Sequence, residues 1–268
     1  MELSERVQKR LKSKYGEWAL VTGATSGLGK YIALALAKSG LNLVINARNH
    51  DQLQTIAKEW QREYDIKIEV VAEDVSTIDG VLNLIEKTST INIGLVVQAA
   101  GFGTSGAFID NALEEELNMI DVNCKAVVML THEFAKRFKK QQRGGFIMFS
   151  SIVAFQGTAF SANYAATKAF IQTFSEGLQI ELKPYDIDVL IAAPGPVNTS
   201  FGDRANMKMD NAESPELVAK HILKALGRQR NVVPGRIGKF LTYSLRLLPR
   251  WGKIKVMKMV MLGMTKNQ

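Results

Sequence analysis

The sequence predicts a doubly wound α/β fold, in which helices cover both faces of a parallel sheet, and three observations support this. Short apolar runs alternate with helix-patterned segments through most of the chain. A glycine-rich turn joins the first predicted strand to the first predicted helix. No linker or internal repeat divides the 268 residues, and their 46% hydrophobic content suffices for one core. We expect a single domain with its core over residues 17–233 and a basic helical tail over residues 236–268.

The expected elements alternate along the core and give about seven strands. Strands are predicted at residues 18–22, 41–46, 66–71, 94–98, 146–150, 188–193 and 232–233. Helices are predicted at residues 28–39, after Asp51 as the capping residue, and at residues 78–87, 113–119, 126–139, 163–182 and 215–226. Residues 1–15 are expected to form a further amphipathic helix, because Leu3, Val7, Leu11 and Tyr15 recur at four-residue spacing.

The net charge of +8 is concentrated at the carboxyl end of the chain. No acidic residue follows Glu216, whereas twelve Lys and Arg residues do. Such a tail suits an anionic membrane surface or an acidic partner, and a plain solvated face is the alternative. Its methionines are expected to pack mainly in the core, with an adaptable apolar pocket as the second possibility. We expect no transmembrane helix, signal peptide or nucleic-acid motif.

Cysteine and histidine usage argues against metal and disulfide chemistry. Cys124 is the only cysteine, so it can form neither an internal disulfide nor a thiolate cluster, and we expect it to be a small buried residue in a cytoplasmic protein. His50, His132 and His221 are scattered without the spacing of metal ligands. No metal site is therefore expected.

The glycine-rich turn predicts a site for a dinucleotide. Gly23, Gly27 and Gly29 permit a tight turn that lets backbone amides at a helix N-terminus approach a pyrophosphate. The second strand ends in Asn46-Ala47-Arg48-Asn49, without the Asp or Glu that usually binds the ribose of NAD. Arg48 suits a 2′-phosphate instead, so we expect NADP(H), with a plain surface arginine as the alternative.

A second group of residues predicts proton transfer. Tyr164 and Lys168 lie one helical turn apart on the same face. A neighbouring ammonium favours the phenolate and is expected to lower the pKa of the tyrosine toward neutrality. Ser151 lies at the end of a predicted strand, where the ligand crevice of a doubly wound sheet is found, and is placed to hydrogen-bond a substrate oxygen.

In order along residues 17–233, these motifs resemble those of the short-chain dehydrogenase/reductase family, a group of Rossmann-type oxidoreductases. The matching positions are residues 22–29, Asp74-Val75, Gln98-Ala99-Ala100-Gly101, Asn123, Ser151, Tyr164 with Lys168, and residues 194–199. One departure is that the family usually has Asn-Asn where this chain has Gln98-Ala99. Because the catalytic positions are retained, we expect rearranged bracing of the neighbouring strand and not inactivation.

The resemblance implies a role for each matching residue. Tyr164 would be the general acid/base, Lys168 would lower its pKa and bind the nicotinamide ribose, Ser151 would orient the carbonyl, and Asn123 would hold a relay water. The implied cofactor-binding residues are Gly23, Thr25, Ser26, Gly27, Leu28, Gly29, Arg48, Asp74, Val75, Ala100, Gly101, Tyr164, Lys168, Pro194, Gly195, Val197 and Thr199. The implied substrate-binding residues are Ser151, Val153, Phe155, Phe160, Phe201, Met207 and Met209.

The leading functional prediction is an NADPH-dependent reductase of a ketone or other carbonyl, such as a 3-oxoacyl or other lipid-like compound, because the implied substrate wall is mostly apolar. One alternative is an alcohol or hydroxysteroid dehydrogenase that works in the oxidative direction. The other is a non-catalytic NADP-binding sensor or membrane-associated interaction protein. The family resemblance further implies a homodimer or homotetramer.

Overall fold

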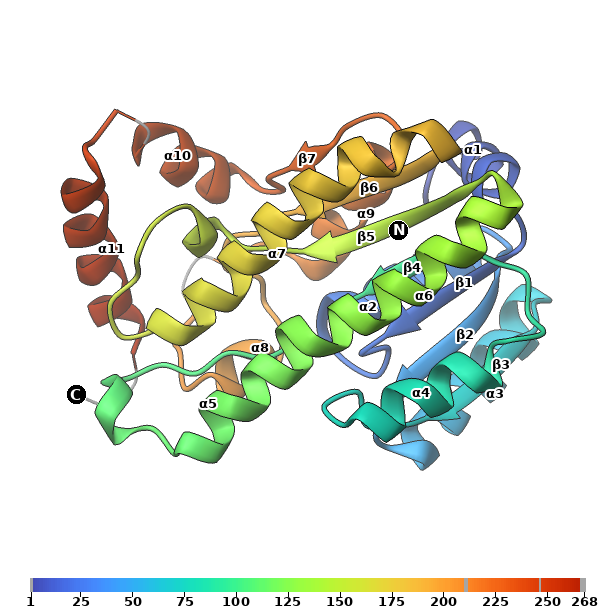
Figure 1. The fold of residues 1–268 in the computed structure, drawn as a ribbon, viewed down its shortest axis with the longest axis horizontal. Coiled ribbons are helices and arrows are strands. Elements are labelled where there is room, and N and C mark those ends of the chain that lie inside the picture. Colours follow the sequence, from blue (N-terminus) through green and yellow to red (C-terminus); the bar gives the residue numbers. More distant parts are fainter. Residues whose placement is uncertain (1, 210–211, 246, 266–268) are drawn as a thin grey trace.

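A computed structural model describes residues 2–209, 212–245 and 247–265. They form three layers, in which one seven-stranded sheet lies between two layers of helices (Figure 1). The strands are β1 (Trp18–Thr22), β2 (Asn42–Ala47), β3 (Ile68–Ala72), β4 (Ile93–Gln98), β5 (Gly144–Phe149), β6 (Ile187–Ala192) and β7 (Asn231–Val232). The main helices are α1 (Glu5–Tyr15), α2 (Gly27–Lys38), α3 (His50–Tyr64), α4 (Ile78–Lys87), α5 (Leu113–Ile120), α6 (Ala126–Gln141), α7 (Ala162–Glu181), α8 (Phe201–Arg204), α9 (Pro215–Ala225), α10 (Arg236–Leu245) and α11 (Arg250–Met264).

The sheet has the predicted doubly wound topology. All strand pairs are parallel, in the order β3-β2-β1-β4-β5-β6-β7. The chain therefore winds outward in both directions from β1 and β4. Where the order reverses, the loops that follow these two strands diverge and leave a crevice at the carboxyl edge of the sheet.

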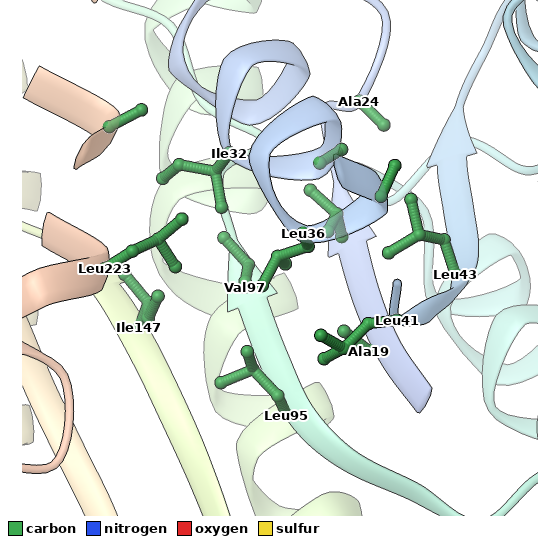
Figure 2. Close-up of a cluster of buried hydrophobic side chains, with 14 of the residues drawn as sticks. Ala19, Ala24, Ile32, Leu36, Leu41, Leu43, Leu95, Val97, Ile147 and Leu223 are labelled. Atoms are coloured by element: carbon green, nitrogen blue, oxygen red, sulfur yellow. The ribbon is translucent and has the colours of Figure 1, made fainter. Parts of the chain in front are cut away.

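Apolar side chains fill the space between the sheet and the helices on each face. Figure 2 shows Ile32 and Leu36 of α2 directed toward Val97 of β4, with Leu223 of α9 beside them. On the opposite face, α4, α6 and α7 cover a second buried cluster, which includes Phe138 of α6. Because both faces are covered, the strands are almost continuously apolar, as parallel strands must be.

Three local features differ from the sequence-based expectations. Strand β5 begins at Gly144, two residues before the predicted start. Glycines are poor strand formers and hid this start, but they are needed here, because a Cβ at Gly144 or Gly145 would collide with the ring of Phe138 or of Tyr15. Asn49, and not Asp51, caps α3: its side chain accepts a hydrogen bond from the Gln52 amide at 3.0 Å.

The third difference lies between α5 and α6. The sequence predicts two separate helices there, but a π-helical turn, Asp121–Lys125, joins them into one continuous helical segment. Such turns insert one extra residue and are found frequently at functional sites. This turn carries Asn123, one of the predicted catalytic residues.

The first and last helices, α1 and α11, lie toward opposite ends of the strands (Figure 1). Helix α1 is amphipathic as predicted and buries Leu11 and Tyr15 near the amino ends of β4 and β5, where the Tyr15 hydroxyl donates to Asp188 Oδ2 at 2.6 Å. Helices α10 and α11, red in Figure 1, lie beyond the carboxyl ends of the strands. Within the described residues, no helix combines the length and apolarity needed to cross a membrane.

Candidate active site

A cavity of about 650 Å³ opens at the carboxyl edge of the sheet, and two different walls enclose it. The first, which we call the cofactor wall, is built by the loops that follow the strands and by the start of α7. It includes Gly23, Thr25, Ser26, Gly27, Leu28, Arg48, Asp74, Val75, Ala100, Gly101, Tyr164, Lys168, Pro194, Gly195, Val197 and Thr199. These are the predicted cofactor-binding residues with the exception of Gly29, which packs behind the turn.

The glycine turn has the geometry of a phosphate cradle. Gly23 has φ +68°, and a Cβ at this position would lie 2.9 Å from the backbone N and Cα of Ala100. A Cβ at Gly29 would collide with the Gly23 carbonyl oxygen. Ser26 precedes α2 and makes no side-chain capping bond, so the amides at this helix N-terminus face the cavity without a capping side chain. Backbone in this arrangement fits the pyrophosphate of a dinucleotide.

Two arginines lie near each other on the side of the cavity toward β2. Arg48 is exposed and lines the cavity, while Arg204 of α8 places its guanidinium 3.9 Å from the centroid of the Phe102 ring. Burial, and then the charge of Arg48, lowers the pKa of Arg204. The neighbouring Asn46 is not available for the ribose, because its Nδ2 donates to the Val71 carbonyl at 2.9 Å. Sequence reasoning missed Arg204, because no motif links it to Arg48.

Tyr164, Lys168 and Ser151 meet on the cofactor wall near the carboxyl end of β5. Lys168 Nζ lies 5.6 Å from the centroid of the Tyr164 ring and donates to the Phe149 carbonyl at 3.0 Å. Ser151 Oγ accepts a 3.4 Å hydrogen bond from the Val153 amide, and the Ser151 side chain also hydrogen-bonds the Tyr164 phenol. The sequence spacing therefore brings these three side chains together as predicted.

Burial has the largest effect on the pKa values of Tyr164 and Lys168. It raises the pKa of the Tyr164 phenol, and the hydrogen bond with Ser151 offsets this rise only in part. Burial also lowers the pKa of the Lys168 ammonium to about 8. The expected lowering of the Tyr164 pKa is not found here, because desolvation raises this pKa by more than the hydrogen bond with Ser151 lowers it. The phenol is consequently held in its acid form.

Asn123 braces the strand end next to these residues. Its Nδ2 donates to the Phe102 carbonyl at 2.9 Å and to Thr167 Oγ1 at 3.1 Å, and its Oδ1 accepts from the Phe102 amide at 3.2 Å. A small separate cavity of about 10 Å³ is lined by Asn123, Lys168 and Gln98. This is about the least space in which a cavity can hold one water molecule.

Gln98 replaces the bracing that the usual asparagine gives. Its Nε2 donates to Thr131 Oγ1 at 2.7 Å and approaches Met148 Sδ at 3.6 Å, which ties β4 to α6 and β5. Gln98 lines the small cavity, and its Oε1 is buried and has no hydrogen-bond partner among the described residues. The departure from the family pattern is thus accommodated by a different set of side-chain contacts.

The second wall of the cavity, which we call the apolar wall, comes mainly from α8, the residues after it, and the C-terminal helices, with Val153 contributed by the short turn after β5. It comprises Val153, Phe201, Met207, Met209, Leu241, Met257, Val260, Met261 and Met264. Phe155 and Phe160 were predicted to belong to it, but they do not line the cavity: Phe155 is exposed, and Phe160 packs in the cluster behind Met207 and Met261.

Sequence reasoning assigned the tail methionines mainly to core packing. The structure shows that Met257, Met261 and Met264 line the cavity, and the first two are also buried. Their spacing of four and three residues places them on one face of α11, which was a usable signal. What the spacing does not reveal is that this face returns to the carboxyl edge of the sheet.

Two further expectations concern metal and thiol chemistry. Among residues 2–209, 212–245 and 247–265, no group of three or more His, Cys, Asp or Glu side chains is arranged to hold a metal ion. Cys124 is a free, half-buried thiol, and burial raises its pKa to about 11. It is therefore not an activated nucleophile.

The fold and this site define an oxidoreductase of the short-chain type, and comparisons with known proteins agree. The family described as short chain dehydrogenase matches residues 17–210, so the chain belongs to that family. It is 29% identical to a 7β-hydroxysteroid dehydrogenase of Mediterraneibacter gnavus over 85% of this chain and 90% of that protein. It is 30% identical to a very-long-chain 3-oxoacyl-CoA reductase-like protein of Arabidopsis thaliana over 89% of this chain and 77% of that protein.

Solved structures that resemble this chain include a short-chain dehydrogenase as well. One determined for a study of 7β-hydroxysteroid dehydrogenase stereoselectivity superimposes with a TM-score of 0.85 at 27% identity, covering 92% of this chain and 98% of the other. A short-chain dehydrogenase from Sphingobium yanoikuyae in complex with NADPH superimposes with a TM-score of 0.77 at 25% identity, covering 89% and 95%.

Proposed function

We propose that this oxidoreductase uses NADPH to reduce the carbonyl of a bulky, lipid-like ketone to a secondary alcohol. One observation carries the proposal: Ser151, Tyr164 and Lys168 lie together in a single cavity, on a wall that fits a dinucleotide and faces a wall that is almost entirely apolar. A carbonyl oxygen at Ser151 and Tyr164 would direct the body of its molecule toward the apolar wall.

In this mechanism the cofactor supplies the hydride that the carbonyl carbon accepts. Ser151 orients the carbonyl through a hydrogen bond to its oxygen. Tyr164, which burial holds protonated, donates its proton to that oxygen as negative charge develops there. Lys168 stabilises the resulting phenolate, and a water held in the small cavity beside Asn123 and Lys168 would take part in replacing the proton.

The preference for NADPH rests on the two arginines. Arg48 and Arg204 repel each other, and a doubly charged 2′-phosphate between them would convert that repulsion into charge-assisted hydrogen bonds. No carboxylate stands directly at the end of β2 to bind a ribose, since the strand ends at Ala47 and Arg48 and Asn49 follow it. The NADPH complex of the Sphingobium yanoikuyae relative supports the same assignment.

The substrate class rests on the apolar wall. Several methionines line it, and their flexible, polarisable side chains adapt to irregular apolar molecules. The curated relatives are named for a hydroxysteroid and for very-long-chain 3-oxoacyl-CoA, which are both bulky and lipid-like. We therefore propose steroid-like ketones and 3-oxoacyl thioesters as the compounds to test first.

The decisive experiment measures NADPH oxidation with such ketones for the wild type and Tyr164→Phe. Loss of the general acid is expected to lower kcat by about 10²- to 10⁴-fold, while NADPH still binds because the phosphate cradle is unchanged. Tyr185→Phe, outside the cavity, is the matched control and should retain activity. If Tyr164→Phe keeps wild-type turnover, the proposed mechanism is wrong.

Oxidation of a secondary alcohol is the second candidate, favoured by the dehydrogenase names of the relatives. Assays with NADP⁺ and hydroxysteroids in the same panel compare the two directions. Binding of NADPH without turnover of any compound, in either direction, would instead favour the sensor.

The assembly and location that fit this enzyme are a homo-oligomer in the cytoplasm. Exposed apolar side chains gather on α5, α6 and α7, among them Leu117, Val128 and Phe170. A second copy that covers this face would bury them without blocking the cavity walls named above. The unpaired thiol of Cys124 suits a reducing compartment. Light scattering at several protein concentrations tests the oligomer.

A further inference from the structure

The two C-terminal helices, α10 and α11, present different chemistry on their two sides. On the inner side, Leu241, Met257 and Met261 line the substrate end of the cavity. On the outer side, large apolar side chains point away from the protein: Leu247 between the helices is 90% exposed, Phe240 71% and Trp251 65%. Isolated exposed apolar residues are ordinary, but three so exposed on one short helix pair mark an interaction surface.

The charge on the same outer side has one sign. Lys239, Arg250, Lys255 and Lys258 are exposed on the same two helices, and Lys239 and Arg250 directly precede Phe240 and Trp251 in the sequence. No acidic residue occurs after Glu216, so no carboxylate in this part of the sequence offsets them. Lys255 places its ammonium 5.2 Å from the centroid of the Trp251 ring. A folded acidic protein would match the charge, but it would leave little reason for a protruding leucine and tryptophan on the same face.

A lipid bilayer with anionic headgroups matches both properties at once. Tryptophan and other apolar side chains partition into the interfacial layer, and lysine and arginine remain level with the phosphates. The outward residues Trp251, Lys255 and Lys258 follow one another at helical spacing, so α11 can lie flat on such a surface.

From this arrangement we infer that the C-terminal helix pair docks on an anionic lipid surface and delivers the mouth of the substrate cavity to it. Helix α11 is then shared between the membrane and the pocket, since Met257, Val260 and Met261 face the cavity while Trp251 and Lys258 face outward. The inference rests on the proposed function in that the pocket takes a lipid-like ketone, which would reach it directly from the bilayer without crossing water.

The first test uses neither cofactor nor substrate, so its result does not depend on the proposed reaction. The full chain is sedimented with vesicles of phosphatidylcholine and phosphatidylserine, and with vesicles of phosphatidylcholine alone. We expect binding to the anionic vesicles that weakens as salt is added, together with a blue shift of Trp251 fluorescence. Trp60 is buried and Trp18 half-buried, and Trp251→Phe should remove the shift while most of the binding remains.

Two pairs of variants separate the apolar and ionic contributions. Leu247→Ser with Trp251→Ser is expected to lower partitioning by at least about tenfold. Its matched control is Ile78→Ser with Leu82→Ser, which removes two side chains of 53% and 50% exposure from α4. Lys255→Glu and Lys258→Glu should each lower partitioning by at least about fivefold, because each removes one positive charge and adds a negative one. Lys136→Glu with Lys140→Glu on α6 is the control for charge alone, and circular dichroism verifies that every variant folds.

A final arm connects docking to catalysis. The same ketone is offered in anionic vesicles and in detergent micelles, with a water-soluble ketone as reference. We expect the Leu247→Ser, Trp251→Ser variant to lose its rate advantage in vesicles and to keep wild-type turnover of the soluble ketone. Absence of binding to anionic vesicles at low salt overturns the inference. So does self-association of the free protein that Leu247→Ser abolishes, because a second copy would then cover this face.

Discussion

The two walls of the cavity are built from the same chain but under different physical constraints. On the cofactor wall, backbone atoms must approach one another and a phosphate, so a single methyl group is decisive: Gly23 and Gly29 leave no room for a Cβ. On the apolar wall, Met261 and Met264 need only fill space, and many side chains can do so. The difference teaches that one wall has its residue identities prescribed by chemistry, whereas the other prescribes only their polarity and approximate volume.

The largest effect is expected when one methyl group is added to the glycine turn and, as a control, one to an exposed glycine of α11. Gly29→Ala would force its Cβ against the Gly23 carbonyl oxygen and open the phosphate cradle. Loss of one or two charge-assisted hydrogen bonds should weaken NADPH binding by about a hundredfold. Gly263→Ala is the matched control, because no atom lies within 4 Å of its added Cβ and alanine favours a helix. Titration of NADPH fluorescence measures both, and equal affinities would contradict the argument.

A smaller effect is expected where the cofactor wall meets the 2′-phosphate. Arg48→Asp should weaken NADPH binding by about ten- to a hundredfold, with NADH affected far less, because it replaces an attractive charge by a repulsive one. Arg204→Leu should act in the same direction and more weakly, since Arg204 also packs on Phe102. Arg62→Asp lies outside the cavity and serves as the charge control. Unchanged cofactor preference in Arg48→Asp would remove the case for NADPH.

Protonation gives a third, milder way to probe the cofactor wall. Reduction needs a protonated Tyr164, and the Lys168 ammonium must carry its charge to stabilise the phenolate that forms. Burial lowers the pKa of Lys168 to about 8 and raises that of Tyr164, so both groups are protonated below about pH 8. We therefore expect kcat/KM for reduction to be level below pH 8 and to fall by about tenfold for each further pH unit. A level profile up to pH 9.5 would contradict this assignment.

The contrast between the walls also explains what the sequence could predict. The strand order, the phosphate turn and the meeting of Ser151 with Tyr164 followed from spacing and from the family resemblance, because those positions admit few alternatives. Arg204 and the inner face of α11 did not follow, since they reach the cavity only through tertiary packing. The erroneous placement of Phe155 and Phe160 has the same cause: apolar character indicates burial or a pocket, but not which of the two.

The successful predictions differ in how much of the site they specified. The glycine turn predicted both a structure and its ligand, since close backbone approach has few other uses. The Tyr164 and Lys168 pair predicted proximity, but the direction of the tyrosine pKa shift depended on desolvation, which no spacing reports. The π turn at Asn123 was likewise invisible, because its residues are compatible with an ordinary helix.

Substitutions in the apolar wall should have the smallest effect, and one that is confined to bulky substrates. In Met264→Ala, the Lys208 amide still holds the backbone through its hydrogen bond to the Met264 carbonyl at 2.6 Å, so mainly the side chain that lines the cavity is lost. We expect KM for a bulky ketone to rise about tenfold, with kcat and the KM of a small ketone nearly unchanged, because only apolar contact with the substrate body is removed. Met259→Ala removes an exposed methionine from the same helix and should leave both KM values unchanged in solution. If the two variants behave alike, α11 is a structural support and not a wall of the substrate site, and the substrate class must then be sought from α8 and Met207 alone.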